Sequence, residues 1–211
     1  SEMCIRDSGS TPSQNAQFLL FLAAFIKGVD EYQEMLRCCV SYPGNDHRLG
    51  GNEAPPAIIS IFLGDELTAI LDAIIQGTEY VDITKKKLTI GVDTLPEIPQ
   101  DTTDRNRTSP LAFTGNKFEF RMLGSSQSIA SPNVVLNTIM TEELRQFADI
   151  LEKADDFQSA LQKLLHDTFT AHQRIIFNGN GYDDAWVQEA KRRGLANLRD
   201  TADCMPAVSY T

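Results

Sequence analysis

The chain has 211 residues, of which 42% are hydrophobic, so it is long enough to bury the core of one or two domains. Its formal net charge of −10 argues against nonspecific binding to nucleic acid or to an anionic membrane, because both favour a basic protein surface. The longest apolar run, residues 18–26, is about half as long as a membrane-spanning helix, and we expect it to be buried in the core.

The cysteines bear on the cellular compartment. The four cysteines stand at positions 4, 38, 39 and 204, which matches neither the spacing of a metal site nor that of a disulfide framework. The adjacent Cys38 and Cys39 cannot easily bridge to each other. These features indicate a reducing compartment, and we expect a cytoplasmic protein.

The two ends of the chain differ from the rest of the sequence. Residues 1–9 resemble translated adapter sequence and lack the layout of a signal peptide, so we interpret them as a non-native leader. After Pro206 the sequence stops without a predicted closing element, and we interpret residues 207–211 as a truncated end. We therefore expect the sequence to be a fragment of a longer protein.

The first predicted element is a long amphipathic helix over residues 14–40. Apolar residues recur at helical spacing along it, among them Leu22, Phe25 and Ile26, while acidic residues lie on the far side. The helix is expected to end before Pro43, because proline and the glycine that follows it both oppose helix continuation.

A strand, a helix and a hairpin are predicted next. The short, isoleucine-rich run at residues 57–63 predicts a buried strand. Asp65 is expected to cap a helix that stops at Gly77. Residues 79–94 alternate in two pieces around the lysines at 85–87, which predicts a hairpin with a solvated basic turn.

The last third of the chain is predicted to be mainly helical. Helices are expected from Pro132 to about residue 153, from an Asp155 cap to about residue 172, and over residues 183–193. Residues 178–181 predict a tight turn and lack the spacing of a phosphate-binding loop. Strands mixed irregularly with long helices indicate an α+β fold rather than a parallel doubly wound sheet.

Polar chemistry is concentrated around one predicted strand, residues 117–121. Strand alternation places Lys117, Glu119 and Arg121 on one face and two phenylalanines on the other. The phenylalanine face is expected to enter the core. The charged face is either an ordinary solvated strand face or part of a site.

The loop upstream of this strand adds two further cations. It runs between Pro96 and Pro110, which is long for an idle connection, and it carries Arg105 and Arg107. Guanidinium groups match phosphate and carboxylate geometry, and a carboxylate among cations can hold a divalent metal. This combination suits phosphoryl-transfer chemistry.

Arg-Asn-Arg-Thr-Ser at 105–109 and Lys-Phe-Glu-Phe-Arg at 117–121 together resemble the C-terminal catalytic motifs of glutamine synthetases. The wording from residue 114 to residue 128 is similar to the type III branch of that family. A second motif, residues 47–56, resembles the family segment in which an arginine precedes a Glu-Ala-Pro flap. Similar text extends over about residues 14–206.

The resemblance implies that residues 10–206 are part of a glutamine synthetase catalytic domain, in which an antiparallel sheet is backed by long helices. Such enzymes phosphorylate the side-chain carboxylate of glutamate with ATP, and ammonia then displaces the phosphate. The resemblance therefore implies ATP with Mg²⁺ or Mn²⁺, the substrates glutamate and ammonia, and a homo-oligomeric full-length protein.

Motif position also implies individual roles. Arg48 and Arg121 are expected to bind substrate, and Glu53 is expected to be the flap acid that shields the intermediate and accepts a proton from ammonium. Arg107 is expected to act in catalysis at the transferred phosphate. The nucleotide is expected to contact Arg105, Arg107 and Lys117, and the metal is expected to bind Glu119.

The sequence departs from the family pattern in two respects. Ala112 stands where many relatives carry a further arginine. The family's other metal ligands and its N-terminal domain have no counterpart in the sequence, so the isolated chain is expected to be inactive.

Two other functions stay open. A different arginine-cluster phosphotransferase, such as a guanidino kinase-like enzyme, would use the same cations, although the flap motif at 52–55 argues against it. A catalytically dead regulatory or binding subunit is favoured only by Ala112.

Overall fold

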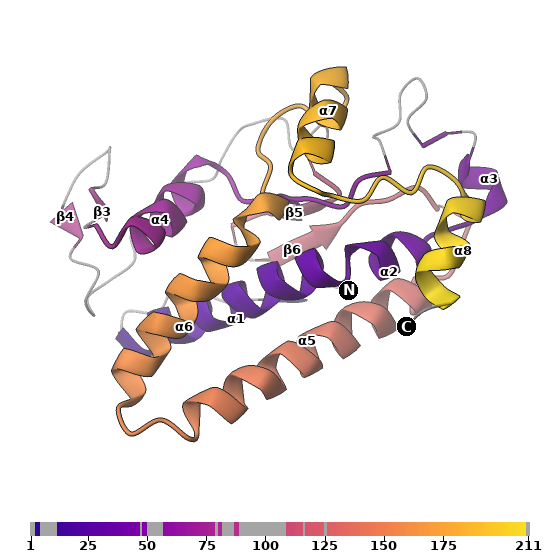
Figure 1. Cartoon of the computed structure of the whole chain (residues 1–211). Helices are drawn as coiled ribbons and strands as arrows, with labels where there is room; N and C mark the ends of the chain where they lie inside the picture. Colours follow the sequence, from indigo (N-terminus) through magenta and orange to yellow (C-terminus); the bar gives the residue numbers. More distant parts are fainter. Residues whose placement is uncertain are drawn as a thin grey trace.

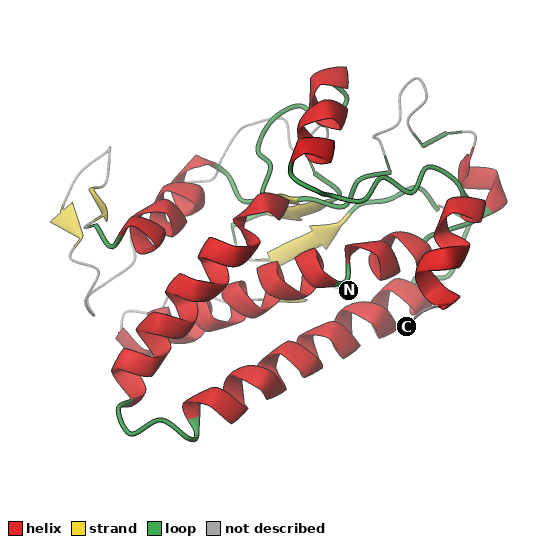
Figure 2. Ribbon diagram, viewed as in Figure 1, coloured by secondary structure: helices red, strands yellow, loops and turns green. Residues whose placement is uncertain are grey.

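The computed structural model describes residues 3–4, 12–46, 48–49, 57–78, 80–81, 87–88, 109–115, 117–124 and 126–209. Its strands are β1 (Met3–Cys4), β2 (Ile61–Phe62), β3 (Tyr80–Val81), β4 (Lys87–Leu88), β5 (Leu111–Phe113) and β6 (Lys117–Phe120). Its helices are α1 (Pro12–Glu31), α2 (Gln33–Cys38), α3 (Pro43–Asp46), α4 (Asp65–Gln76), α5 (Ala130–Leu151), α6 (Phe157–His172), the short 3₁₀ helix η2 (Gln173–Ile175), α7 (Asp184–Arg192) and α8 (Thr201–Ser209) (Figures 1 and 2). None of the described helices is long and apolar enough to cross a membrane.

The main sheet is small and mixed, with strand order β1-β6-β5-β2. β6 runs antiparallel to both β1 and β5, whereas β2 runs parallel to β5. Ile61 of β2 also forms a parallel bridge to Ile176. The expected antiparallel sheet is therefore wrong at β2, because a long crossover rather than a hairpin joins β2 to β5.

A second, two-stranded sheet confirms the predicted hairpin. Strands β3 and β4 pair antiparallel, with Tyr80 opposite Leu88 and Val81 opposite Lys87. Lys87 therefore belongs to a strand, and the rest of the predicted basic turn lies outside the described residues.

The core lies between α1 and the main sheet. Leu22, Phe25 and Ile26 of α1 are buried, as the helical spacing predicts. Phe25 stacks on Phe118 of β6 with ring centroids 3.9 Å apart, and Phe113 of β5 lies 5.2 Å from Phe118. Helices α1, α5 and α6 pack together in a layer, seen as the three long helices of Figure 1.

The predicted helix over residues 14–40 is broken at Tyr32, whose backbone angles (φ −109°, ψ 23°) leave the helical region. The buried side chain of Gln33 occupies the break: its Nε2 donates to the carbonyl oxygen of Asp30, and its Oε1 accepts from the amide of Ala196. Apolar spacing does not reveal this break, because Leu36 beyond it is buried in phase with α1.

Helix ends differ from expectation by one or two residues. Gly64 (φ 81°), not Asp65, precedes α4, and Gly77 (φ 64°) ends that helix as predicted. Asp156, not Asp155, caps α6, because its carboxylate accepts from the amides of Gln158 and Ser159.

Of the last two helices, α7 agrees with the prediction from the sequence and α8 does not. Helix α7 begins after its Asp183 cap and ends before Gly194, as predicted. The sequence predicts no helix after residue 193, and this is wrong, since α8 spans Thr201–Ser209 and contains Pro206. Proline is an unfavourable residue inside a helix, so the local sequence argues against an element that the structure contains.

One ion pair is buried where α1 crosses α5. Glu143 of α5 is fully buried, and the Nζ of Lys27 donates to it, to Glu31 and to Gln146. Burial raises the pKa of Glu143, although the Lys27 ammonium opposes the shift. Burial by itself lowers the pKa of Lys27, but hydrogen bonds to Glu143 and Glu31 outweigh it and raise the pKa overall. Without its partner, Glu143 would be a buried uncompensated carboxylate.

We predict that Lys27→Met destabilises the chain by about 3–5 kcal/mol at pH 7 and by less near pH 4. Removing the ammonium raises the pKa of Glu143 further above its ordinary value of 4.5. Stability from a raised pKa is present below the unfolded value and is lost as pH rises through the folded value. Urea denaturation between pH 4 and 7 measures this, and the Lys27→Met/Glu143→Gln double variant is the control. A Lys27→Met deficit that is the same at both pH values would contradict the assignment.

Candidate functional site

The candidate site is built on the solvent side of β6. Phe118 is 3% exposed and packs against α1, whereas Lys117, Glu119 and Arg121 have side chains that are 28%, 34% and 30% exposed. We call the surface formed by these three residues the charged face. The predicted alternation is confirmed for Phe118, whereas Phe120 is only partly buried and packs against the same core. The charged face lies on the opposite side of the strand from the core.

An ion-pair triad joins the side chains of the charged face. Arg121 donates from Nε to Glu119 Oε2 over 2.9 Å and from Nη2 to the same oxygen over 2.5 Å. The Nζ of Lys117 lies 3.8 Å from Glu119 Oε1. The carboxylate therefore lies between two cations and fixes the direction of the guanidinium. Because all three groups are about one-third exposed, solvent limits each pair to below about 1 kcal/mol of stability.

Ala112 of β5 is the neighbour of this triad. It pairs directly with Glu119 across the strands and is fully buried. Side chains of directly opposed residues point to the same face of a sheet, so a larger residue at 112 would stand beside Glu119. The residue of β5 that stands beside Glu119 is therefore a small apolar one and not a cation.

The structure brings together three of the predicted site residues, Lys117, Glu119 and Arg121. Arg48 lies at an exposed position after α3, next to the buried Leu49. The remaining predicted residues, Glu53, Arg105 and Arg107, fall outside the described residues.

Sequence reasoning missed the buried hydroxyl groups at the start of β5. Ser109 is 4% exposed; its Oγ accepts from Ser60 Oγ over 2.8 Å and donates to the carbonyl oxygen of Phe177 over 2.8 Å. A signal existed, because Ser60 is the one polar residue in the apolar run at 57–63. Polar groups inside such a run need partners when they are buried.

The predicted turn at 178–181 also has a role that its sequence did not indicate. Asn178 Oδ1 accepts from the amides of Leu63 and Gly64, and its Nδ2 donates to Thr68 Oγ1. This side chain joins the end of β2 to the first turn of α4. The turn is thus a structural clamp between these two elements.

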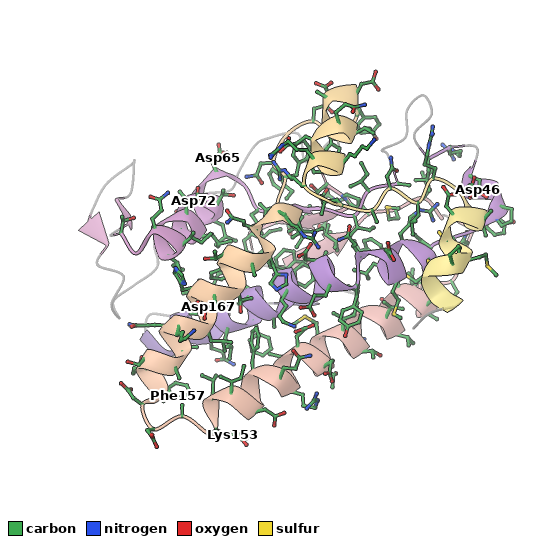
Figure 3. All side chains as sticks on the ribbon, viewed as in Figure 1. Asp46, Asp65, Asp72, Lys153, Phe157 and Asp167 are labelled. Carbon is green, nitrogen blue, oxygen red and sulfur yellow. The ribbon has the colours of Figure 1, made fainter. Side chains whose placement is uncertain are left out.

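The described residues do not form a metal site by themselves. No group of three or more His, Cys, Asp or Glu side chains among them is placed to hold a metal ion. Asp65 and Asp72 on α4 and Asp167 on α6 lie on the outer surface of the molecule (Figure 3). Glu119 is a single carboxylate already engaged by Arg121, so at most it is one ligand of a larger set.

The chain is similar to known proteins along nearly its whole length. It is 50% identical over 206 residues to the type-3 glutamine synthetase of Dictyostelium discoideum, an alignment that covers 96% of the chain and 28% of that protein. It is 45% identical over 205 residues to a glutamine synthetase of Butyrivibrio fibrisolvens, covering 95% of the chain and 29% of the relative. The chain is homologous to glutamine synthetases. A glutamine synthetase from Bacteroides fragilis (strain YCH46) is 44% identical over 197 residues, or 90% of the chain and 27% of the relative.

A family model agrees with this result. The model for the glutamine synthetase C-terminal domain matches residues 160–210, which run from within α6 to α8. The chain spans little more than a quarter of the length of the glutamine synthetases it matches. Residues 160–210 are therefore similar to the C-terminal domain of glutamine synthetases.

We predict stability changes of very different size for two neighbouring residues of β6. Phe118→Ala should lower the free energy of unfolding by about 3–5 kcal/mol, because it removes a buried ring that stacks on Phe25. Glu119→Gln should change it by less than about 1 kcal/mol, because the ion pairs it removes are partly exposed. Chemical denaturation of both variants measures the difference, and comparable losses would show that the charged face is part of the structural core.

Proposed function

We propose that the chain is part of a cytoplasmic glutamate–ammonia ligase, which forms glutamine from glutamate, ammonia and ATP through γ-glutamyl phosphate. The observation that carries this proposal is identity of 44–50% to glutamine synthetases over at least 90% of the chain. The charged face supports it, because an activated carboxyl phosphate needs cations near its phosphate and carboxylate groups.

Each residue of the charged face would bind a different ligand. Arg121 would bind the carboxylate of glutamate through its planar fork of donors, and Lys117 would face the nucleotide as a point charge. Glu119 would give one oxygen ligand to Mg²⁺ or Mn²⁺, which supplies charge neutralisation at the phosphates when it is bound. The described residues do not supply the other ligands of such an ion.

Four further residues complete the proposed site. Arg48 would hold the substrate glutamate, and Glu53 would close over the acyl phosphate, keep water away and accept a proton from ammonium. Arg105 and Arg107 would bind phosphate oxygens, with Arg107 at the transferred group. The full-length protein is proposed to be a homo-oligomer that supplies the remaining parts of the site.

A second candidate is a regulatory or binding subunit without catalysis. The observation that favours it is the small, buried Ala112 beside Glu119, at a position where the resemblance to the family implies an arginine. Direct assay of the complete protein separates the two functions, since only the ligase forms glutamine with ATP and ammonia.

We predict different kinetic defects for Arg48 and Glu53 in the complete enzyme. Arg48→Ala should raise KM for glutamate about tenfold or more with a smaller effect on kcat, because a guanidinium–carboxylate contact stabilises ground state and transition state alike. Glu53→Ala should leave KM nearly unchanged, lower the rate of glutamine formation and release phosphate that is not matched by glutamine.

Both products should be measured in one reaction, phosphate by a coupled assay and glutamine by chromatography. Arg145→Ala is the matched control for loss of an arginine, since Arg145 pairs with Glu142 and Asp149 on the outer surface of α5. Tight coupling of phosphate to glutamine in Glu53→Ala, together with a raised KM, would exclude the flap role.

A further inference from the structure

Arg121 is attached to β5 through Pro110, a residue that cannot donate a backbone hydrogen bond. Along β5 and β6, Ala112 pairs with Glu119, and the amide of Thr114 donates to the carbonyl oxygen of Lys117. Every second pair of an antiparallel ladder normally exchanges two hydrogen bonds, and Pro110 and Arg121 form the next such pair. The amide of Arg121 donates to Pro110 over 2.6 Å, but proline has no N–H to return the bond. The bond from the Arg121 amide is therefore the one ladder bond that Pro110 can form in this pair.

The neighbouring residue, Ser109, ties Pro110 to two other segments of the chain. Its buried hydroxyl group accepts from Ser60 of the segment leading into β2 and donates to the carbonyl oxygen of Phe177. The amide of Leu111 donates to the carbonyl oxygen of Ser60 over 3.1 Å, so both sides of Pro110 are tied to the same segment. Pro110 is thus held in place by its two neighbours in sequence as well as by its ladder partner Arg121.

The acceptor of this hydroxyl chain is itself fixed. The amide of Phe177 donates to the carbonyl oxygen of Ile61 over 2.8 Å. Its ring stacks on Trp186 with centroids 3.7 Å apart. Phe177 therefore cannot easily move together with Ser109. Its fixed carbonyl oxygen holds Ser109, and Ser109 in turn holds the adjacent Pro110.

We infer that Ser109 is a positioning residue that sets, through Pro110, where the Arg121 guanidinium stands on the charged face. The importance of this position rests on the proposed function, in which Arg121 binds an anionic carboxylate. The competing explanation is that the Ser109 hydroxyl only satisfies buried polar groups and has no particular effect on Arg121.

The test uses NMR of the 211-residue chain and three variants. Ser109→Ala should speed hydrogen exchange at the Arg121 amide by about tenfold, after correction for any change in global stability. A factor of this size corresponds to the loss of about one buried hydrogen bond. It should also shift the Arg121 Nε–H resonance, because that group donates to Glu119. Ser109→Thr keeps the hydroxyl and should restore both signals. Ser60→Ala keeps the bond from Ser109 to Phe177, so it should change the Arg121 signals less than Ser109→Ala does. It replaces Ser109→Thr as the comparison if the threonine variant does not fold.

The matched control is Asn178→Ala. Asn178 lies next to Phe177 but clamps Leu63 and Gly64 to α4, so its loss should lower stability without moving the Arg121 signals. The emission of Trp186, the one tryptophan of the chain, should stay unchanged in Ser109→Ala, because the Phe177 amide keeps its bond to Ile61.

Two outcomes would overturn the inference: unchanged Arg121 signals in Ser109→Ala, or equal changes in Ser109→Ala and Asn178→Ala. The proposed function is tested separately by the KM for glutamate of Arg121→Ala in the complete enzyme. If that KM is unchanged while Ser109→Ala shifts the Arg121 signals in the 211-residue chain, the positioning role holds and the substrate role of Arg121 fails.

Discussion

The stacking of Phe118 on Phe25 is the contact on which the rest of the arrangement depends. It fixes β6 against α1, the helix that also packs against α5 and α6. Because strand side chains alternate, burying Phe118 directs its two charged neighbours, Lys117 and Glu119, to the opposite face. One apolar contact therefore determines which side of the sheet can carry chemistry. The ion pairs of that side contribute little to stability, so their arrangement is free to serve a ligand.

The helical layer behind the sheet is specified by buried charges as well as by apolar packing. Asp30 of α1 is 2% exposed and lies 2.8 Å from both His172 Nδ1 and Arg174 Nε. Lys27 and Glu143 form the second pair, on the side of α1 that faces α5. A buried charge is costly without its partner, so each pair favours one placement of α1 against its neighbours. These pairs thus fix the position of α1 against its neighbouring helices. Because the sheet packs on α1, its position is fixed as well.

Much of the fold follows from local sequence patterns. The alternation at 117–121 and the apolar stripe of α1 predict the correct buried faces, because burial of a whole face is a strong and periodic signal. The same patterns miss the break at Tyr32 and the parallel pairing of β2, since both depend on residues distant in the chain, such as Ala196 for the first and Leu111 for the second. The charged face is predictable, whereas the anchoring hydroxyl of Ser109 is not, because nothing near it in sequence identifies Phe177 as its acceptor.

The position of β2 has a consequence for the order in which the chain folds. Ile61 bonds on one side to β5 and on the other to Ile176, partners that lie 50 and 115 residues further along the chain. Closing loops of this length costs conformational entropy before any contact compensates for it, so such pairings form late. During synthesis, the helix α1 and the β5–β6 hairpin are complete long before residue 176 leaves the ribosome. Until then one edge of β2 stays open, and the nascent chain exposes an unpaired, apolar strand edge of the kind that associates with other chains.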